Sequence, residues 1–114
     1  MSVDDLYQQG FNFRCAGQYT EAKDVLRRVL SMEPRHVDAR MQMALILGFE
    51  GDFDESLNQL QALSTEVPAN DDVRYELAMT QFMLGMNDEA CANLKLILSH
   101  DPSHEKALQQ STYC

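Results

Sequence analysis

Three similar strings recur at an interval of 34 residues, and this interval constrains the fold more than any other feature of the chain. GQYTEA begins at residue 17, GDFDES at residue 51 and GMNDEA at residue 85. The three prolines of the chain, Pro34, Pro68 and Pro102, keep the same interval. A fixed period of this length is typical of stacked supersecondary units, each of which buries an apolar face against its neighbour.

Each unit is predicted to be a helical hairpin. Apolar residues follow helical spacing, for example Phe53, Leu57, Leu60 and Leu63. A glycine follows the first helix because the residue after a helix C-cap often adopts a positive φ. Asp52 with Glu55 forms a capping-box pattern for the next helix. Ser2 and Asn70 are the predicted N-caps of the first and third leading helices, whereas the second offers no obvious N-cap.

Small residues recur at matching positions of the units: Gly10, Ala44 and Ala78 on the first helix, and Ala22, Ser56 and Ala90 on the second. With the glycines and prolines, this pattern resembles the tetratricopeptide repeat (TPR) family over residues 3–104. The resemblance implies that the paired helices cross closely at these small residues. The resemblance implies an all-α fold, a right-handed superhelical solenoid in a single domain of residues 1–114. Its repeats are 3–36, 37–70 and 71–104, followed by a short C-terminal capping helix at 104–112. Gln81 and Asn87 stand where the family usually has large apolar or aromatic residues, and Arg40 and Arg74 stand where an apolar residue is common. We therefore expect the third hairpin to pack less tightly than the first two.

The chain is acidic, with a formal net charge of −9. Nucleic acid is not an expected partner, because no surplus of Lys and Arg is present to displace counterions. The sequence shows no secretory signal and no apolar run long enough for a membrane span. These features predict a cytoplasmic protein without membrane insertion.

The three cysteines are an odd number without a CxxC pair, so they indicate neither a disulfide framework nor a zinc site. Cys15 and Cys91 occupy apolar positions of predicted helices. We expect both to be small buried hydrophobic residues in a reducing compartment.

No catalytic or cofactor-binding motif is recognisable, so the chain is predicted to be no enzyme and to hold no cofactor or metal. His100 and His104 lie four residues apart, but Pro102 interrupts the helix that a two-histidine zinc motif needs. A structural role for His36 and His104 in the turns between repeats is the expected alternative.

The resemblance implies that the leading helices of the repeats line a concave groove. The repeat interval places nine apolar residues on the corresponding faces in three rows: Tyr7, Met41 and Tyr75; Phe11, Leu45 and Met79; and Cys15, Phe49 and Met83. Such a surface either belongs to the core or awaits a partner. We favour a protein or peptide partner with apolar anchors, since no other segment of the chain is long enough to fill the groove. The predicted contacts are Tyr7, Phe11, Met41, Leu45, Phe49, Tyr75, Met79 and Met83.

Acidic residues repeat at the start of the same helices, at Asp4, Asp38 and Asp72. Their simplest role is to stabilise the positive end of each helix dipole. If they and Glu76 also serve binding, they select a partner with basic residues flanking its apolar anchors. TPR clamps that hold the acidic tails of heat-shock chaperones use Lys, Asn and Arg on these faces, so a partner carboxylate is disfavoured here.

Two alternative functions follow from the ends of the chain. The string LYQQGFN at residues 6–12, followed by GQY at 17–19, resembles the opening repeat of bacterial type III secretion chaperones. That resemblance implies a groove that holds a hydrophobic translocator client. At the other end, the helix at 104–112 offers little more than Ala107 and Leu108 as an apolar face. A weak cap of this kind favours a structural element that self-associates as a homodimer.

Overall fold

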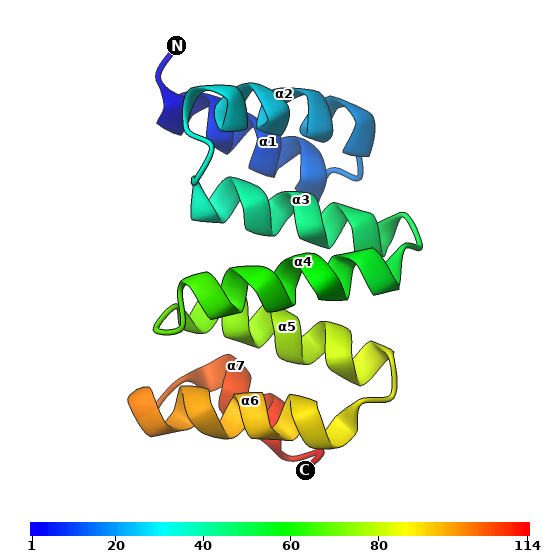
Figure 1. Ribbon diagram of the computed structural model, residues 1–114, viewed down its shortest axis with the longest axis vertical. Coiled ribbons are helices and arrows are strands. Elements are labelled where there is room, and N and C mark those ends of the chain that lie inside the picture. The colour runs from blue at the N-terminus through cyan, green and yellow to red at the C-terminus, as the bar shows by residue number, and fades with distance from the viewer.

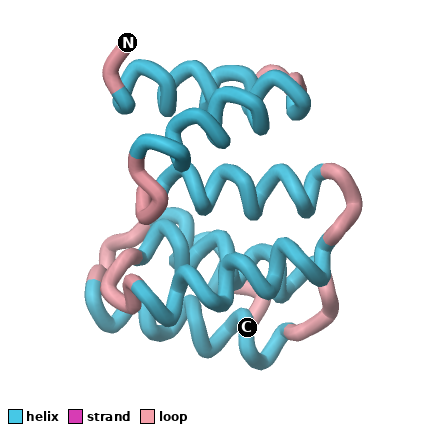
Figure 2. The backbone as a smooth tube through the Cα atoms, turned by 45° about the horizontal axis from the view of Figure 1, so that its top comes forward, coloured by secondary structure: helices cyan, strands magenta, loops and turns pink.

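The computed structural model describes all 114 residues as helices joined by short loops (Figure 1, Figure 2). The seven helices are α1 (Val3–Cys15), α2 (Tyr19–Met32), α3 (Val37–Phe49), α4 (Phe53–Glu66), α5 (Asp71–Met83), α6 (Asn87–His100) and α7 (Glu105–Ser111). Three hairpins stack along the long axis, with the N-terminus at one end and α7 against α6 at the other (Figure 1). The predicted all-α solenoid with a short C-terminal helix is confirmed. No helix combines the length and apolar character needed to cross a membrane.

The turn inside each hairpin has the same geometry. Gly17, Gly51 and Gly85 all have positive φ, at 76°, 97° and 77°. The residue after each glycine donates its N–H to the carbonyl five residues earlier, for example Asp52 to Leu47 at 2.8 Å. This pairing closes a Schellman motif, which satisfies carbonyls at the helix C-terminus. The even spacing of these glycines therefore reflects a repeated need for the left-handed backbone conformation.

The N-caps of the leading helices show one feature that the sequence prediction missed. Ser2 and Asn70 cap α1 and α5 as predicted. His36 caps α3, because its Nδ1 accepts the backbone N–H of Ala39 at 3.0 Å. His104 caps α7 in the same way. Both histidines therefore have the structural role expected of them in the turns.

The core consists of three apolar clusters, centred on successive hairpins. Paired helices approach closely where the small residues meet. Ser56 Oγ donates to the carbonyl oxygen of Ala44 at 2.7 Å, so α4 is bonded directly to the backbone of α3. At Gly10, an added Cβ would lie 2.8 Å from the Leu26 side chain. These contacts require small side chains at the crossings, as predicted.

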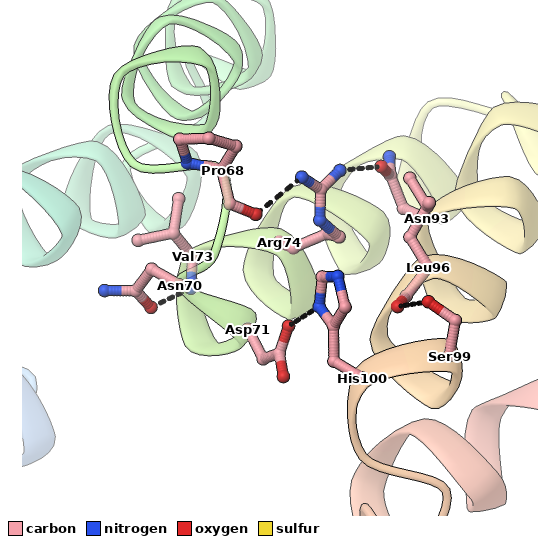
Figure 3. A network of polar contacts seen from close by, with 9 residues as sticks. All are labelled: Pro68, Asn70, Asp71, Val73, Arg74, Asn93, Leu96, Ser99 and His100. Atoms are coloured by element: carbon pink, nitrogen blue, oxygen red, sulfur yellow. Dashed lines mark hydrogen bonds and ion pairs between the residues drawn. The ribbon is translucent and has the colours of Figure 1, made fainter.

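Hydrogen bonds replace apolar contacts in part of the third hairpin (Figure 3). Arg74 donates to Asn93 Oδ1 at 3.0 Å and to the carbonyl oxygen of Pro68 at 2.9 Å. Asn93 in turn donates to Gln81 Oε1 at 2.7 Å, and Gln81 is buried. Only Arg74 Nε is buried without a partner. Two of the residues that depart from the usual apolar pattern, Arg74 and Gln81, thus form a polar network with Asn93 between α5 and α6. The looser packing of this hairpin stays a prediction.

The cysteine predictions were wrong. Cys91 on α6 and Cys114 form a disulfide, with their Cα atoms 5.8 Å apart and a sequence separation of 23. The two cysteines come together because α7 folds back onto α6. Neither the number of cysteines nor their spacing in the sequence predicts this path of the chain. Cys15 is free and exposed rather than buried. Cys15 is the last residue of α1, and the residues of the turn that follows it are exposed as well.

Substitution of Gly51 tests the requirement for positive φ. We expect Gly51→Ala to lower the free energy of unfolding by about 1–2 kcal/mol, because a Cβ disfavours this conformation. Crowding does not contribute, since no atom lies within 4 Å of the added Cβ. Gly51→Asn is the control, because Asn tolerates the left-handed region better. Urea denaturation that shows equal losses for Ala and Asn would contradict this explanation.

Substitution of Cys114 tests how α7 is held. A disulfide closing a loop of this length contributes about 3 kcal/mol in the chain-entropy description. We expect Cys114→Ser to increase the amide exchange rate of Ala107, which is fully buried in the third cluster, and to leave Leu60 protected. Cys15→Ser, at the free cysteine, is the control. Unchanged protection of Ala107 would show that packing alone holds α7.

Candidate functional site

Two adjoining pockets lie along the leading helices and share Leu45 and Glu76. The charged pocket has a volume of about 380 Å³ and is lined by residues of α1, α3, α5 and the start of α7: Tyr7, Phe11, Arg14, Asp38, Met41, Gln42, Leu45, Asp72, Tyr75, Glu76, His104 and Lys106. The apolar pocket has a volume of about 140 Å³ and is lined by residues of α3, α4 and α5: Leu45, Gly48, Phe49, Phe53, Ser56, Glu76, Met79, Thr80 and Met83. We call the two pockets together the groove.

The groove brings together the residues that the repeat interval singled out. Five of the eight predicted contacts line the charged pocket: Tyr7, Phe11, Met41, Leu45 and Tyr75. The other three, with Leu45 again, line the apolar pocket: Phe49, Met79 and Met83. Cys15, the ninth residue of the predicted rows, lines neither pocket. Whether these residues contact a partner stays a prediction.

The charged pocket is more polar than the sequence rows indicated. Asp38 on α3 and Asp72 and Glu76 on α5 supply three carboxylates, whereas Asp4 is exposed and lies outside both pockets. Arg14 on α1 and Lys106 on α7 add two cations that sequence reasoning missed. Arg14 could have been found, because it lies three residues after Phe11 and so shares its helix face. Lys106 could not, because its position depends on how α7 folds back.

Both cations of the charged pocket are engaged with neighbouring side chains. Arg14 Nε donates to Gln42 Oε1 at 2.7 Å, and Gln42 is only 3% exposed. The Arg14 guanidinium carbon lies 5.2 Å from the ring centroid of Phe11 and 5.8 Å from that of Phe49. Lys106 Nζ lies 5.6 Å from the Tyr75 ring. Cation–π contacts at these distances are favourable, so both cations are stabilised without a carboxylate partner.

The carboxylates of the charged pocket have no such partners. The four ion pairs of the protein join Lys23 to Glu50, Arg27 to Asp24, Arg40 to Glu66 and His100 to Asp71. None of them involves Asp38, Asp72 or Glu76. Burial raises the pKa of Glu76, and the charges of Lys106 and Arg14 offset this only in part. The groove therefore contains a partly desolvated carboxylate that lacks a direct cation.

Aromatic contacts stabilise the walls of the groove. The rings of Tyr7 and His36 stack with centroids 5.2 Å apart, and those of Tyr19 and Phe49 stack at 5.7 Å. Burial raises the pKa of the Tyr7 hydroxyl, which therefore stays protonated and able to donate a hydrogen bond at neutral pH. Stacked rings lose little further freedom when a partner binds, which favours association.

The apolar pocket offers adaptable hydrophobic surface. Phe49 is 54% exposed and Met83 is 66% exposed, whereas Leu45 and Met79 are half-buried. Methionine side chains are flexible and polarizable, so they adjust to different apolar partners. The arrangement is therefore suited to noncovalent binding of an apolar side chain next to a charged one.

The histidines are occupied in other ways. His104 accepts the backbone N–H of Ala107, and His100 Nδ1 lies 3.1 Å from Asp71 Oδ1. No group of three His, Cys, Asp or Glu side chains lies close enough to hold a metal ion.

The raised pKa of Glu76 gives a prediction for stability. Glu76 binds its proton more tightly in the folded protein than in the unfolded chain. This tighter binding contributes to the free energy of unfolding in full below the unfolded-state pKa, and the contribution is lost as pH rises through the folded-state pKa. Glu76→Gln, which stays neutral, should raise the free energy of unfolding at neutral pH and change it little near about pH 4. Urea denaturation at both pH values measures this difference. Glu89→Gln, at an exposed glutamate, controls for net charge, and an equal effect of Glu76→Gln at both pH values would contradict the prediction.

Comparisons with solved structures show which proteins share this fold. YrrB, a TPR protein with an unusual peptide-binding site, has a TM-score of 0.80 at 25% identity, over 98% of this chain and 58% of that one. PilF of Pseudomonas aeruginosa has a TM-score of 0.85 at 18% identity, over 96% and 50% of the two chains. PcrH, in complex with the chaperone binding region of PopB, has a TM-score of 0.78 at 16% identity, over 97% and 92%. The chain thus spans less than two thirds of the length of YrrB and of PilF.

Comparison of sequences identifies the family. No curated protein matches the chain. The tetratricopeptide repeat family matches it over residues 6–36 and again over residues 50–111. Because the second match alone covers more than half of the chain, the protein belongs to the tetratricopeptide repeat family, whose repeats form protein–protein interaction modules.

Proposed function

We propose that this protein is a noncatalytic module that binds a polypeptide segment with apolar anchors in the groove. The observation that supports this most strongly is that all eight predicted contacts line two adjoining pockets. Two of the seven large exposed apolar side chains, Phe49 and Met83, lie together in one of these pockets. Apolar surface that gathers in a hollow is typical of an interaction site.

Apolar anchors alone give only weak binding at a site of this size. Three buried anchors contribute about 1.5–3 kcal/mol each, and association costs about 4 kcal/mol or more. The net gain is at most about 5 kcal/mol, which corresponds to a dissociation constant on the order of 0.1 mM. Tighter binding needs polar contacts in the charged pocket.

A chaperone for a hydrophobic client is the second candidate. It is supported by the opening repeat LYQQGFN and by the fold similarity to PcrH, which covers 92% of that chain. A chaperone of this kind should suppress the light scattering of an aggregating apolar segment, and groove substitutions should abolish that effect.

A cytoplasmic location stays a proposal, and the disulfide argues against it, because disulfides persist mainly in oxidising compartments.

Self-association through the C-terminal end is the third candidate. Leu96 on α6, Leu108 on α7 and Tyr113 are all close to half exposed or more. Two such ends could pair and cover these side chains. Sedimentation of Leu108→Glu beside the wild type tests this candidate, since an unchanged monomer in both would exclude it.

Paired substitutions test the groove as the binding site. Leu45→Glu with Met79→Glu places two charges in the apolar pocket and should abolish the recovery of peptides from a displayed library of random linear sequences. The helical circular dichroism signal should persist, because both side chains are only half-buried.

The matched control is Met32→Glu with Leu96→Glu. This pair introduces the same charges at residues that are 53% and 47% exposed and line neither pocket. Control and wild type should recover the same peptides. Recovery that survives the groove pair would show that binding occurs elsewhere.

A further inference from the structure

We infer that the groove selects a segment in which a lysine or arginine lies beside an apolar anchor, with the cation among Asp38, Asp72 and Glu76 and the anchor in the apolar pocket. This inference rests on the proposed function and adds the chemistry of the partner.

The three carboxylates all line the charged pocket, although they are too far apart to hold a metal ion together. Asp38 and Asp72 are 34 residues apart, so they occupy equivalent positions on the adjacent leading helices α3 and α5. Glu76 follows Asp72 by one helical turn and lies on the same face of α5. Glu76 also lines both pockets. A cation bound at Glu76 therefore lies directly beside the apolar pocket.

No cation of the protein forms an ion pair with these carboxylates, although Lys106 and Arg14 lie near enough to Glu76 to lower its pKa in part. Every ion pair in the structure involves other acidic residues. Arg14 is bonded to Gln42 and lies against two phenylalanine rings, and Lys106 lies over Tyr75. A partly buried carboxylate without a paired cation has an unfavourable desolvation free energy, and a cation from a partner would offset it.

Charge complementarity favours a basic partner over an acidic one. The charged pocket holds three carboxylates against two cations, within a protein of net charge −9. A partner carboxylate would meet this negative field, and it would have to compete for Arg14 with Gln42 and the aromatic rings. A partner ammonium or guanidinium meets unpaired carboxylates and forms charge-assisted hydrogen bonds.

Selection from a displayed library of random linear peptides tests the inference. The wild type should enrich peptides with Lys or Arg within a few positions of Leu, Ile, Met or Phe. The pair Asp72→Asn with Glu76→Gln should keep the apolar preference and lose the basic one. Asp88→Asn with Glu89→Gln removes the same two charge types at exposed positions of α6, and it should select as the wild type does.

A double-mutant cycle then measures the contact with one selected peptide. Replacing its basic residue by norleucine should weaken binding about tenfold to the wild type, and much less to the Asp72→Asn, Glu76→Gln pair. If that pair does not fold, the single substitution Asp38→Asn replaces it, because Asp38 is exposed.

The outcomes separate this inference from the proposed function. Failure of the wild type to enrich any peptide would contradict the proposed function itself. Enrichment of apolar peptides without a basic residue, or with an acidic one, would overturn only the inference about charge. Norleucine replacement could also weaken peptide binding tenfold both to the wild type and to the Asp72→Asn, Glu76→Gln pair. That result would overturn the inference as well, since the basic residue would then bind elsewhere.

Discussion

The close crossing of paired helices at small side chains is the contact on which the groove depends. Each leading helix buries one face against its following helix, where Gly10 meets Leu26 and Ala44 meets Ser56. A second face packs against the neighbouring hairpin. The remaining face has nothing in its own repeat to cover it, and the groove forms there. Larger residues at the crossings would push the helices apart and remove the alignment of these free faces.

The repeated turn geometry keeps the free faces in register. Gly17, Gly51 and Gly85 adopt positive φ and end their helices at equivalent positions, so residues 34 apart occupy equivalent places on successive helices. The helices, the turns, the small crossing residues and the eight groove positions could therefore be predicted, because each follows from a local period. The His36 cap, the Cys91–Cys114 bond and Lys106 in the charged pocket could not, because they depend on a single side-chain orientation or on the path of α7.

The groove combines two kinds of surface that favour different properties of an interaction. In the proposed interaction the apolar pocket would contribute affinity, because the exposed side chains of Phe49 and Met83 would leave water. The charged pocket can contribute discrimination, because an unpaired carboxylate rejects a partner that leaves it buried without a cation. Keeping Glu76 partly buried costs folding stability. A stability cost in a pocket is typical of sites shaped by binding rather than by folding alone.

The short helix α7 connects the end of the solenoid to the groove. His104 is the N-cap of α7 and Lys106 lies in its first turn, yet both line the charged pocket together with residues of α1, α3 and α5. Lys106 also partly offsets the raised pKa of Glu76. The far end of the same segment is bonded to α6 through Cys91 and Cys114. Packing of Ala107 and the disulfide both hold α7 near the pocket, so a shift of α7 that moved Lys106 away would leave Glu76 less compensated.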